Sequence, residues 1–309
     1  YETHLAIPKD LEPGDYDLFV HNGLGGALGW SDPFRVAIRG NSPWSDKVFR
    51  VDDYLTGPRN ADDAIAAALN AAAKNRGGIV EFAAKVYPIT RTIVVPRQAV
   101  LRGAGMDLTM IRLPTGEGPK PPYVAVTGDG DFVVEDLRIQ AVHCPVLICA
   151  PRVDAASWKQ GLEAVDRLGD RRTRNVTVRR CHLVTHILGG RMRRKDKEQL
   201  DRVIDYMLTG RQSLGGYYGI LICGNDITIR DNVILGGGNC IGFKHIEHAV
   251  ISGNRLAVGA AGTGIFCDGK LAWPKDFPKG GGAKIAGHYS REILMEDNEI
   301  KGASEFTRN

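Results

Sequence analysis

Apolar and polar residues repeat along this chain at a fixed spacing. Five nine-residue segments carry an apolar residue at their second, fourth and ninth positions: 131–139, 175–183, 226–234, 248–256 and 292–300. Alternation with a period of two is typical of a β-strand with one buried face. Asn232 and Asn254 are 22 residues apart, and Asn298 lies 44 residues beyond Asn254. A constant period of this size predicts a stack of similar coils.

The connection between like strands is short. A period of about 22 residues leaves no room for a β-α-β crossover, which takes ~30 residues. We therefore predict an all-β fold, a parallel β-helix whose coils stack at ~4.8 Å. The register prediction is that Ile229, Ile251 and Met295 lie in one buried column.

The first 42 residues have a different pattern. DYDLFVHN and PFRVAIRG read as two strands around the Gly-rich stretch GLGGALGWSD. A lone hairpin exposes too much apolar surface to be stable. We expect a partial β-sandwich (Ig-like) segment over 1–42, followed by the β-helix domain over 43–309.

Four consecutive motifs after that boundary resemble a known family. VDDYLTGPRNADDAIAAALNAAA, GGIVEF, VYPITRTIVVP and LRGAGMDLTMI follow one another between residues 51 and 111. In this order they resemble the N-terminal part of the pectate lyase superfamily, which includes polygalacturonase-like hydrolases and phage tailspikes. The resemblance implies a single-stranded right-handed parallel β-helix with an N-terminal capping α-helix. AAKVY (83–87) departs from the usual Pro-Gly turn, so the first coil is expected to be irregular.

Composition excludes some classes of protein. Apolar content of 43% and charged content of 25% are ordinary for a globular domain, and no apolar run reaches the ~20 residues of a membrane span. The net charge is +4, and the basic run 191–197 contains acid and no aromatic residue, so we expect no nucleic-acid partner. The six cysteines form no C-x-x-C pair and are expected to be free core residues. The resemblance implies a secreted or periplasmic protein.

Three insertions flank one strand column. They span 151–174, 186–217 and 269–291, where the other coils are connected by short turns. Long loops around one face of a solenoid predict the walls of a binding groove. Trp158, Trp273 and Tyr218 lie in or beside these loops, where they would stack on sugar rings or form small cores under the loops.

Alternation within the flanked strand assigns its side chains to two faces. Lys244, Phe266 and Asp268 are predicted to face outward, because charged groups do not lie unpaired in a narrow core. The same alternation places the following residues outward as well: Ile148, Ile220 and Ile222. His245 falls in the inward column with Cys223. It is either a core histidine or a catalytic residue on a bulged strand.

Two carboxylates are predicted to lie close together at the end of this strand. Strand rise and coil spacing put the Cα atoms of Glu247 and Asp268 ~6 Å apart. Paired carboxyl groups hydrolyse glycosidic bonds, with retention at ~5–5.5 Å and with inversion at ~6.5–9.5 Å. We therefore expect a glycoside hydrolase acting on a polysaccharide or oligosaccharide, with Asp226 in the adjacent turn contacting substrate. The alternative is that these acids are ordinary exposed turn residues.

Basic residues near the same column favour a second chemistry. Arg152, Lys244 and Lys270 would suit β-elimination on a uronate, where cations bind the carboxylate. Lyases of the superfamily often bind calcium, whereas the hydrolase is expected to need no cofactor or metal. A third alternative is a glycan-binding, tailspike-like solenoid without catalysis. At the C-terminal end of the solenoid, further coils or a partner chain are expected.

Overall fold

The computed structural model describes residues 11–12, 14–38, 44–57, 59–114, 122, 124–142, 144, 146–152, 173–186, 218–236, 239–258, 264–267 and 291–302. The chain divides into two compact units, Tyr1–Ser45 and Asp46–Asn309. The sequence-based boundary lay three residues earlier. Among the described residues, no helix is both long and apolar enough to cross a membrane.

The first unit contains an antiparallel hairpin. Strand β1 (Gly14–Leu18) pairs with β2 (Phe34–Ile38), and the 3-10 helix η1 (Gly26–Gly29) lies in the connection. Tyr16 pairs with Val36, and Leu18 with Phe34, so one face of the hairpin is apolar. That this hairpin belongs to an Ig-like sandwich stays a prediction.

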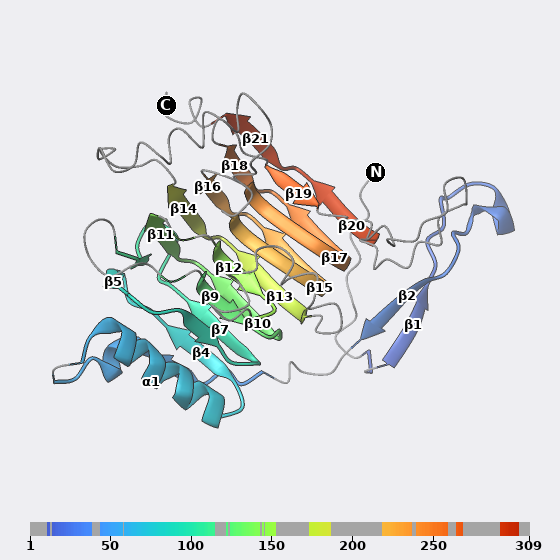
Figure 1. Ribbon diagram of the computed structural model, residues 1–309. Coiled ribbons are helices and arrows are strands. Elements are labelled where there is room, and N and C mark those ends of the chain that lie inside the picture. The colour runs from blue at the N-terminus through green and yellow to red at the C-terminus, as the bar shows by residue number, and fades with distance from the viewer. Residues whose placement is uncertain are drawn as a thin grey trace, which may run out of the picture. The chain divides into compact units, whose positions relative to one another are not determined.

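The second unit is a parallel β-helix with three faces (Figure 1). Face A contains β6 (Ile93–Val95), β9 (Val124–Gly128), β12 (Val146–Ala150), β19 (Ile265–Cys267) and the first parts of β15 (Tyr218–Arg230) and β17 (Asn239–Ser252). Face B contains β3 (Val48–Arg50), β4 (Gly78–Glu81), β7 (Ala99–Arg102), β10 (Phe132–Glu135), β13 (Thr173–Arg179), β20 (Arg291–Glu296) and the second parts of β15 and β17. Face C contains β5 (Val86–Pro88), β8 (Met110–Arg112), β11 (Arg138–Val142), β14 (His182–His186), β16 (Val233–Gly236), β18 (Arg255–Val258) and β21 (Glu299–Gly302). Faces A and B form one 12-stranded sheet because β15 and β17 run through the bend between them.

The predicted register is confirmed. On face B, Ile229 pairs with Ile251, and Ile251 pairs with Met295. The ninth positions of the repeats form a matching column on face C: Ile139, Leu183, Ile234, Leu256 and Ile300. Burial of Met295 was predicted wrongly, since this side chain is 46% exposed whereas Ile229 and Ile251 are fully buried. No described strand stacks on the other side of β20, so within the described part of the chain no strand covers Met295 there.

Helix α1 (Ala61–Lys74) covers the first coils. Asn60 caps it, because its Oδ1 accepts a hydrogen bond from the backbone N–H of Asp63 at 3.0 Å. The helix packs against β3, β4 and β6, and its small residues Ala64, Ala68 and Ala72 are fully buried. A helix in this place covers strand edges and core that would otherwise be open. The short 3-10 helix η2 (Val51–Tyr54) precedes it.

The irregular first coil is held by one tyrosine. Tyr87 is fully buried, and its hydroxyl accepts a hydrogen bond from the N–H of Ala83 and donates one to Asp52, both at 2.8 Å. Lys85 also contacts Asp52 at 2.8 Å. Burial, followed by the hydrogen bond to Asp52, raises the pKa of Tyr87 well above its usual range. The turn without Pro-Gly is therefore closed by side chains.

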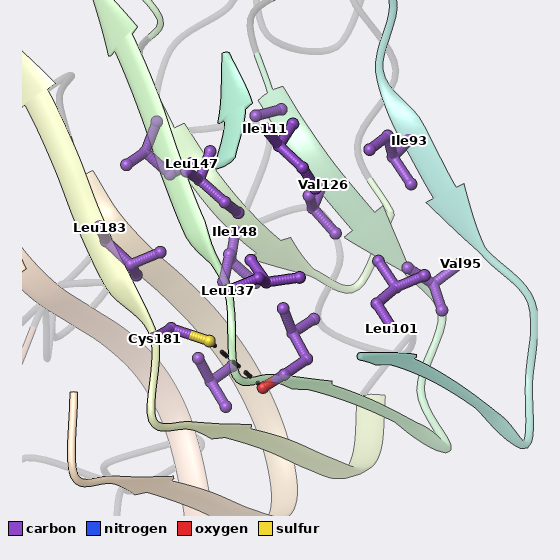
Figure 2. Close-up of a cluster of buried hydrophobic side chains, with 14 of the residues drawn as sticks. Ile93, Val95, Leu101, Ile111, Val126, Leu137, Leu147, Ile148, Cys181 and Leu183 are labelled. Atoms are coloured by element: carbon purple, nitrogen blue, oxygen red, sulfur yellow. Dashed lines mark hydrogen bonds between the residues drawn. The ribbon is translucent and has the colours of Figure 1, made fainter. Parts of the chain in front are cut away.

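The core lies between the three faces. Figure 2 shows side chains from all of them converging, among them Val126 and Ile148 of face A, Leu101 of face B, and Ile111 of face C. The thiol of Cys181 donates a hydrogen bond to the carbonyl of Val134 at 3.5 Å. Five cysteines are buried and form no disulfide bond, as expected: Cys144, Cys149, Cys181, Cys223 and Cys240.

The assignment of side chains to the two sides of face A was partly wrong. Ile148, Ile220 and Ile222 were expected outside, but they are fully buried in the main core. On the opposite side is a second buried group, here called the outer cluster: Val124, Val146, Cys149, Tyr218, Leu221 and Cys223. The error arose because the sequence analysis assumed a constant spacing of 22 residues between paired positions of successive coils. That spacing would pair Cys223 with His245. In the structure Cys223 pairs with Lys244 and Ile222 pairs with Phe243, a spacing of 21.

Candidate functional site

A β-bulge marks the bend between faces A and B. Cys223 pairs with Lys244, but Asn225 pairs with Glu247, so β17 has one residue more than β15 between these pairs. The two residues of β17 in the bulge are His245 and Ile246, and Ile246 is fully buried in the main core. Bulges commonly occur beside active sites, where they redirect side chains. The structure therefore contains a β-bulge at His245, as one of the two sequence-based alternatives required. A catalytic role for His245 stays a prediction.

The backbone of the bend requires glycine at one position. Gly224 has φ 148°, and a Cβ there would lie 2.1 Å from the carbonyl oxygen of Thr173 on the neighbouring coil. The coils approach each other closely at this point because no side chain separates them. The bend is thus fixed by backbone packing.

The turn after the bend has a left-handed residue in each coil. Asp226, His248 and Glu292 have φ values of 59°, 53° and 56°, and each directly precedes the core-facing part of its strand on face B. Because the coils are in register, these three side chains come from equivalent positions of successive coils. Stacking therefore brings an imidazole between two carboxylates.

Asp226, His248 and Glu292, here called the trio, are joined through the histidine. His248 Nδ1 lies 3.6 Å from Asp226 Oδ1, and His248 Nε2 lies 2.5 Å from Glu292 Oε2. All three side chains are more than half exposed. Exposed ion pairs add little stability, whereas an imidazole between carboxylates can accept and deliver protons. The sequence analysis named Asp226 as a candidate but not Glu292, although the repeats that begin at residues 226, 248 and 292 place these three residues at equivalent positions.

Glu247 pairs in register with a residue whose side-chain oxygen is buried. Glu247 is half-buried and is flanked in register by Asn225 on one side and Arg291 on the other. Within the described part of the chain, Asn225 Oδ1 and Thr173 Oγ1 are buried and have no hydrogen-bond partner. Unpaired buried polar atoms are rare in folded proteins and call for a bound water, ion or substrate group. At the bend between faces A and B, the side-chain oxygens of Asn225 and Thr173 can therefore still form hydrogen bonds.

The other predicted site residues are placed only in part. Lys244 holds the register position opposite Cys223, on the outer side of face A, and Phe266 holds the position opposite Gly242. The outward orientation of these two side chains stays a prediction. The remaining residues of that prediction lie outside the described part of the chain: Asp268, Lys270, Trp273 and Trp158. The separation of Glu247 and Asp268 therefore stays a prediction.

Tyr218 does not form an open stacking platform. It is 1% exposed and belongs to the outer cluster, and a Cβ on Gly242 would lie 2.4 Å from its ring. Its ring packs over Gly242, which corresponds to the small-core alternative and not to sugar stacking. Arg152 is exposed, and its backbone N–H donates to Asp129 Oδ1 at 3.3 Å. Its side chain is thus available for a ligand on that face.

Metal ligands are not grouped in the described segments. They contain no group of three or more His, Cys, Asp or Glu side chains that could hold a metal ion. The calcium expected for a lyase stays a prediction.

Two cavities lie near α1, away from the bend in sequence. One, of about 250 Å³, is lined by residues that include Arg50, Asp52 and Glu81; the other, of about 220 Å³, lies between α1 and β6. Arg50 and Glu81 form an ion pair at 3.1 Å, and Asp52 is bound by Lys85 and Tyr87. The charged groups that line the first cavity are therefore paired with one another or with their neighbours.

Comparisons with solved structures give distant similarities. The A-module of the Azotobacter vinelandii mannuronan C-5 epimerase AlgE6 is 16% identical, over 82% of this chain and 56% of its own length, with a TM-score of 0.46. The AlgE4 A-module is 15% identical over 82% and 69%, with a TM-score of 0.44. A Yersinia enterocolitica family 28 exopolygalacturonase is 12% identical over 93% and 55%, with a TM-score of 0.37. The chain thus spans little more than half the length of the first and third of these structures. No family model matches the chain, and neither does any curated protein sequence.

Proposed function

We propose that this protein is a carbohydrate-active enzyme that hydrolyses a polysaccharide or oligosaccharide at the bend between faces A and B. The observation that carries the proposal is the half-buried Glu247 beside a β-bulge, paired in register with Asn225, whose buried Oδ1 has no hydrogen-bond partner among the described residues. A carboxyl group held beside a second carboxylate can act as the general acid in cleavage of a glycosidic bond. Glu247 and Asp268 are the proposed pair, one as the acid and the other as base or nucleophile.

The trio supplies a route for protons at the rim of this site. Glu247 precedes His248 directly, so the imidazole and the proposed acid lie on one turn of β17. Asp226 and Glu292 hold the ring from both sides. His248 would reload the acid between turnovers, while Lys244 and Arg152 bind substrate.

Elimination on a uronate-containing glycan is the second candidate. The observation that favours it is the bulge, which puts the basic pair Lys244 and His245 where β17 leaves face A. A lyase needs a base at the carbon next to the uronate carboxylate and a cation against that carboxylate. Both groups would come from these two positions with Arg152 and Lys270.

A substrate panel tests both chemistries. The protein is incubated with neutral and uronic polysaccharides, and new reducing ends and unsaturated products are measured in parallel. Hydrolysis gives reducing ends alone, and elimination gives both signals. Glu247→Gln and Asp268→Asn should each lower turnover by at least ~100-fold, the low end of general acid–base assistance. The control is Glu299→Gln, an exposed carboxylate on face C paired with Arg255, which should keep full activity.

Two outcomes would contradict the hydrolase. Near-normal turnover in Asp268→Asn would place the chemistry elsewhere, with His245 and Arg152 next to be substituted. Glycan binding without any product from the whole panel would favour a binding solenoid.

A further inference from the structure

The loop between β1 and β2 contains a reactive dipeptide. Asn22–Gly23 is the single Asn–Gly pair in the sequence. Gly23 has φ 81°, and no atom lies within 4 Å of where its Cβ would be. The backbone nitrogen of Gly23 therefore has no side chain of its own to hinder it.

A histidine is aimed at that nitrogen. His21 Nε2 lies 2.8 Å from the carbonyl oxygen of Gly26, and because a carbonyl only accepts, Nε2 carries the proton. Nδ1 is then unprotonated and accepts a hydrogen bond from the N–H of Gly23 at 3.1 Å. The ring is also held edge-to-face against Trp30, with 4.7 Å between the ring centroids. The imidazole is thus fixed in the tautomer and position of a general base for Gly23.

The side-chain carbonyl of Asn22 is polarised at the same time. The N–H of Leu24 donates to Asn22 Oδ1 at 2.8 Å. A backbone donor on this oxygen stabilises the negative charge that develops when a nucleophile adds to the amide carbon. Nucleophile, base and oxyanion donor therefore come from four consecutive residues, His21 to Leu24.

We propose that Asn22–Gly23 is a self-modifying site that converts Asn22 into aspartate and isoaspartate. The Gly23 nitrogen attacks Cγ of Asn22 while its proton passes to His21 Nδ1. The Cγ–Nδ2 bond then breaks, and ammonia leaves with a proton returned by the imidazole, which gives a cyclic imide. Water opens the imide at either carbonyl, so one amide becomes one carboxylate without any oxidant or reductant.

The modification would change an apolar surface. Leu24 and Leu28, in the same loop, are 77% and 94% exposed, and Trp30 is 57% exposed. A new negative charge at position 22 would lie beside these side chains.

Peptide mapping by mass spectrometry tests the proposal. The folded protein is aged at neutral pH, and the Asn22 peptide is followed for the mass gain that converts an amide into an acid, and for isoaspartate. His21→Gln keeps a side chain that can bond to Gly26 but cannot take up the proton. It should slow the conversion roughly tenfold, less than the ~10²–10⁴ of enclosed active sites, because the loop is exposed. Asn232 and Asn254, both buried, serve as internal controls that stay unmodified.

The unfolded chains separate assistance by the fold from the reactivity of the dipeptide. In denaturant the parent and His21→Gln should convert at the same rate, because the ring is no longer aimed at Gly23. Equal rates in the folded proteins would overturn the proposal, as would a folded parent that shows no conversion.

Discussion

The side-chain oxygen of Asn254 accepts two hydrogen bonds from Asn232, one from its backbone N–H at 3.1 Å and one from its Nδ2 at 3.0 Å. The same arrangement joins Asn254 to Asn298, at 3.2 and 2.8 Å. The Nδ2 of Asn254 also donates to the carbonyl of Ile229. In these three coils, one asparagine each therefore satisfies backbone groups at the turn between faces B and C.

Removal of the middle asparagine should be costly. Asn254→Ala leaves the N–H and Nδ2 of Asn232 and the carbonyl of Ile229 without these partners, inside the protein. Each buried polar group left unpaired costs about 1–3 kcal/mol, so we expect the free energy of unfolding to fall by at least ~2 kcal/mol. Denaturant titration measures it. Asn298→Ala is the matched control with a smaller expected loss, because Asn298 is only part-buried. Equal losses would contradict a ladder that depends on burial.

The acid stability of the β-helix should depend on Asp136. Arg180 donates to both of its oxygens, at 2.6 and 2.8 Å, and this hydrogen bonding outweighs burial and lowers the pKa of Asp136 below its ordinary 3.8. A lowered folded-state pKa gives stability that is complete above the ordinary value and is lost as the pH falls through the folded value. Asp136→Asn should therefore destabilise at neutral pH and flatten the acid limb of the curve of unfolding free energy against pH.

Asp231 is the control for this measurement. It has the same left-handed turn conformation, with φ 57° for both residues, but lies 3.9 Å from Arg230 and is 56% exposed. Asp231→Asn should leave the acid limb nearly unchanged. A flattening as large as that of Asp136→Asn would assign the effect to the turn and not to Arg180.

Truncation to alanine should cost very different amounts of stability at two positions of one register column. Ile251→Ala removes a fully buried side chain and should cost ~2–5 kcal/mol, whereas Met295→Ala, 46% exposed, should cost less than ~1 kcal/mol. Thermal unfolding with calorimetry compares the two. A large loss for Met295→Ala would show that further structure covers β20.

Activity, and not stability, should depend on His248. His248→Gln removes a group that can carry a proton but leaves a side chain of similar polarity. We expect turnover on the identified substrate to fall ~100-fold or more with an unchanged melting temperature, because ion pairs of exposed groups add little stability. Lys301→Gln, on face C, controls for loss of a surface charge. A lowered melting temperature with normal turnover would make the trio structural.

The stacking register of the coils could be predicted from the sequence alone. Apolar positions at a fixed period can be buried together in one way only, with equivalent residues stacked, so the columns through Ile251 and Ile234 followed from pattern alone. The capping helix was expected from the resemblance of the motifs between residues 51 and 111 to the pectate lyase superfamily. The resemblance to the pectate lyase superfamily named the architecture that this pattern describes.

Only the tertiary structure decided what lies at the bend. One extra residue in β17 shifts the pairing from Cys223–His245 to Cys223–Lys244, and because side chains alternate, a shift of one residue exchanges inside for outside. The repeats place His248 and Glu292 at equivalent positions, but the contact between their side chains depends on how the two coils pack. Likewise, the burial of Tyr218 depends on its packing over Gly242 from the next coil. Period and alternation define a strand and its neighbours, but bulges and contacts across insertions depend on how the coils pack in three dimensions.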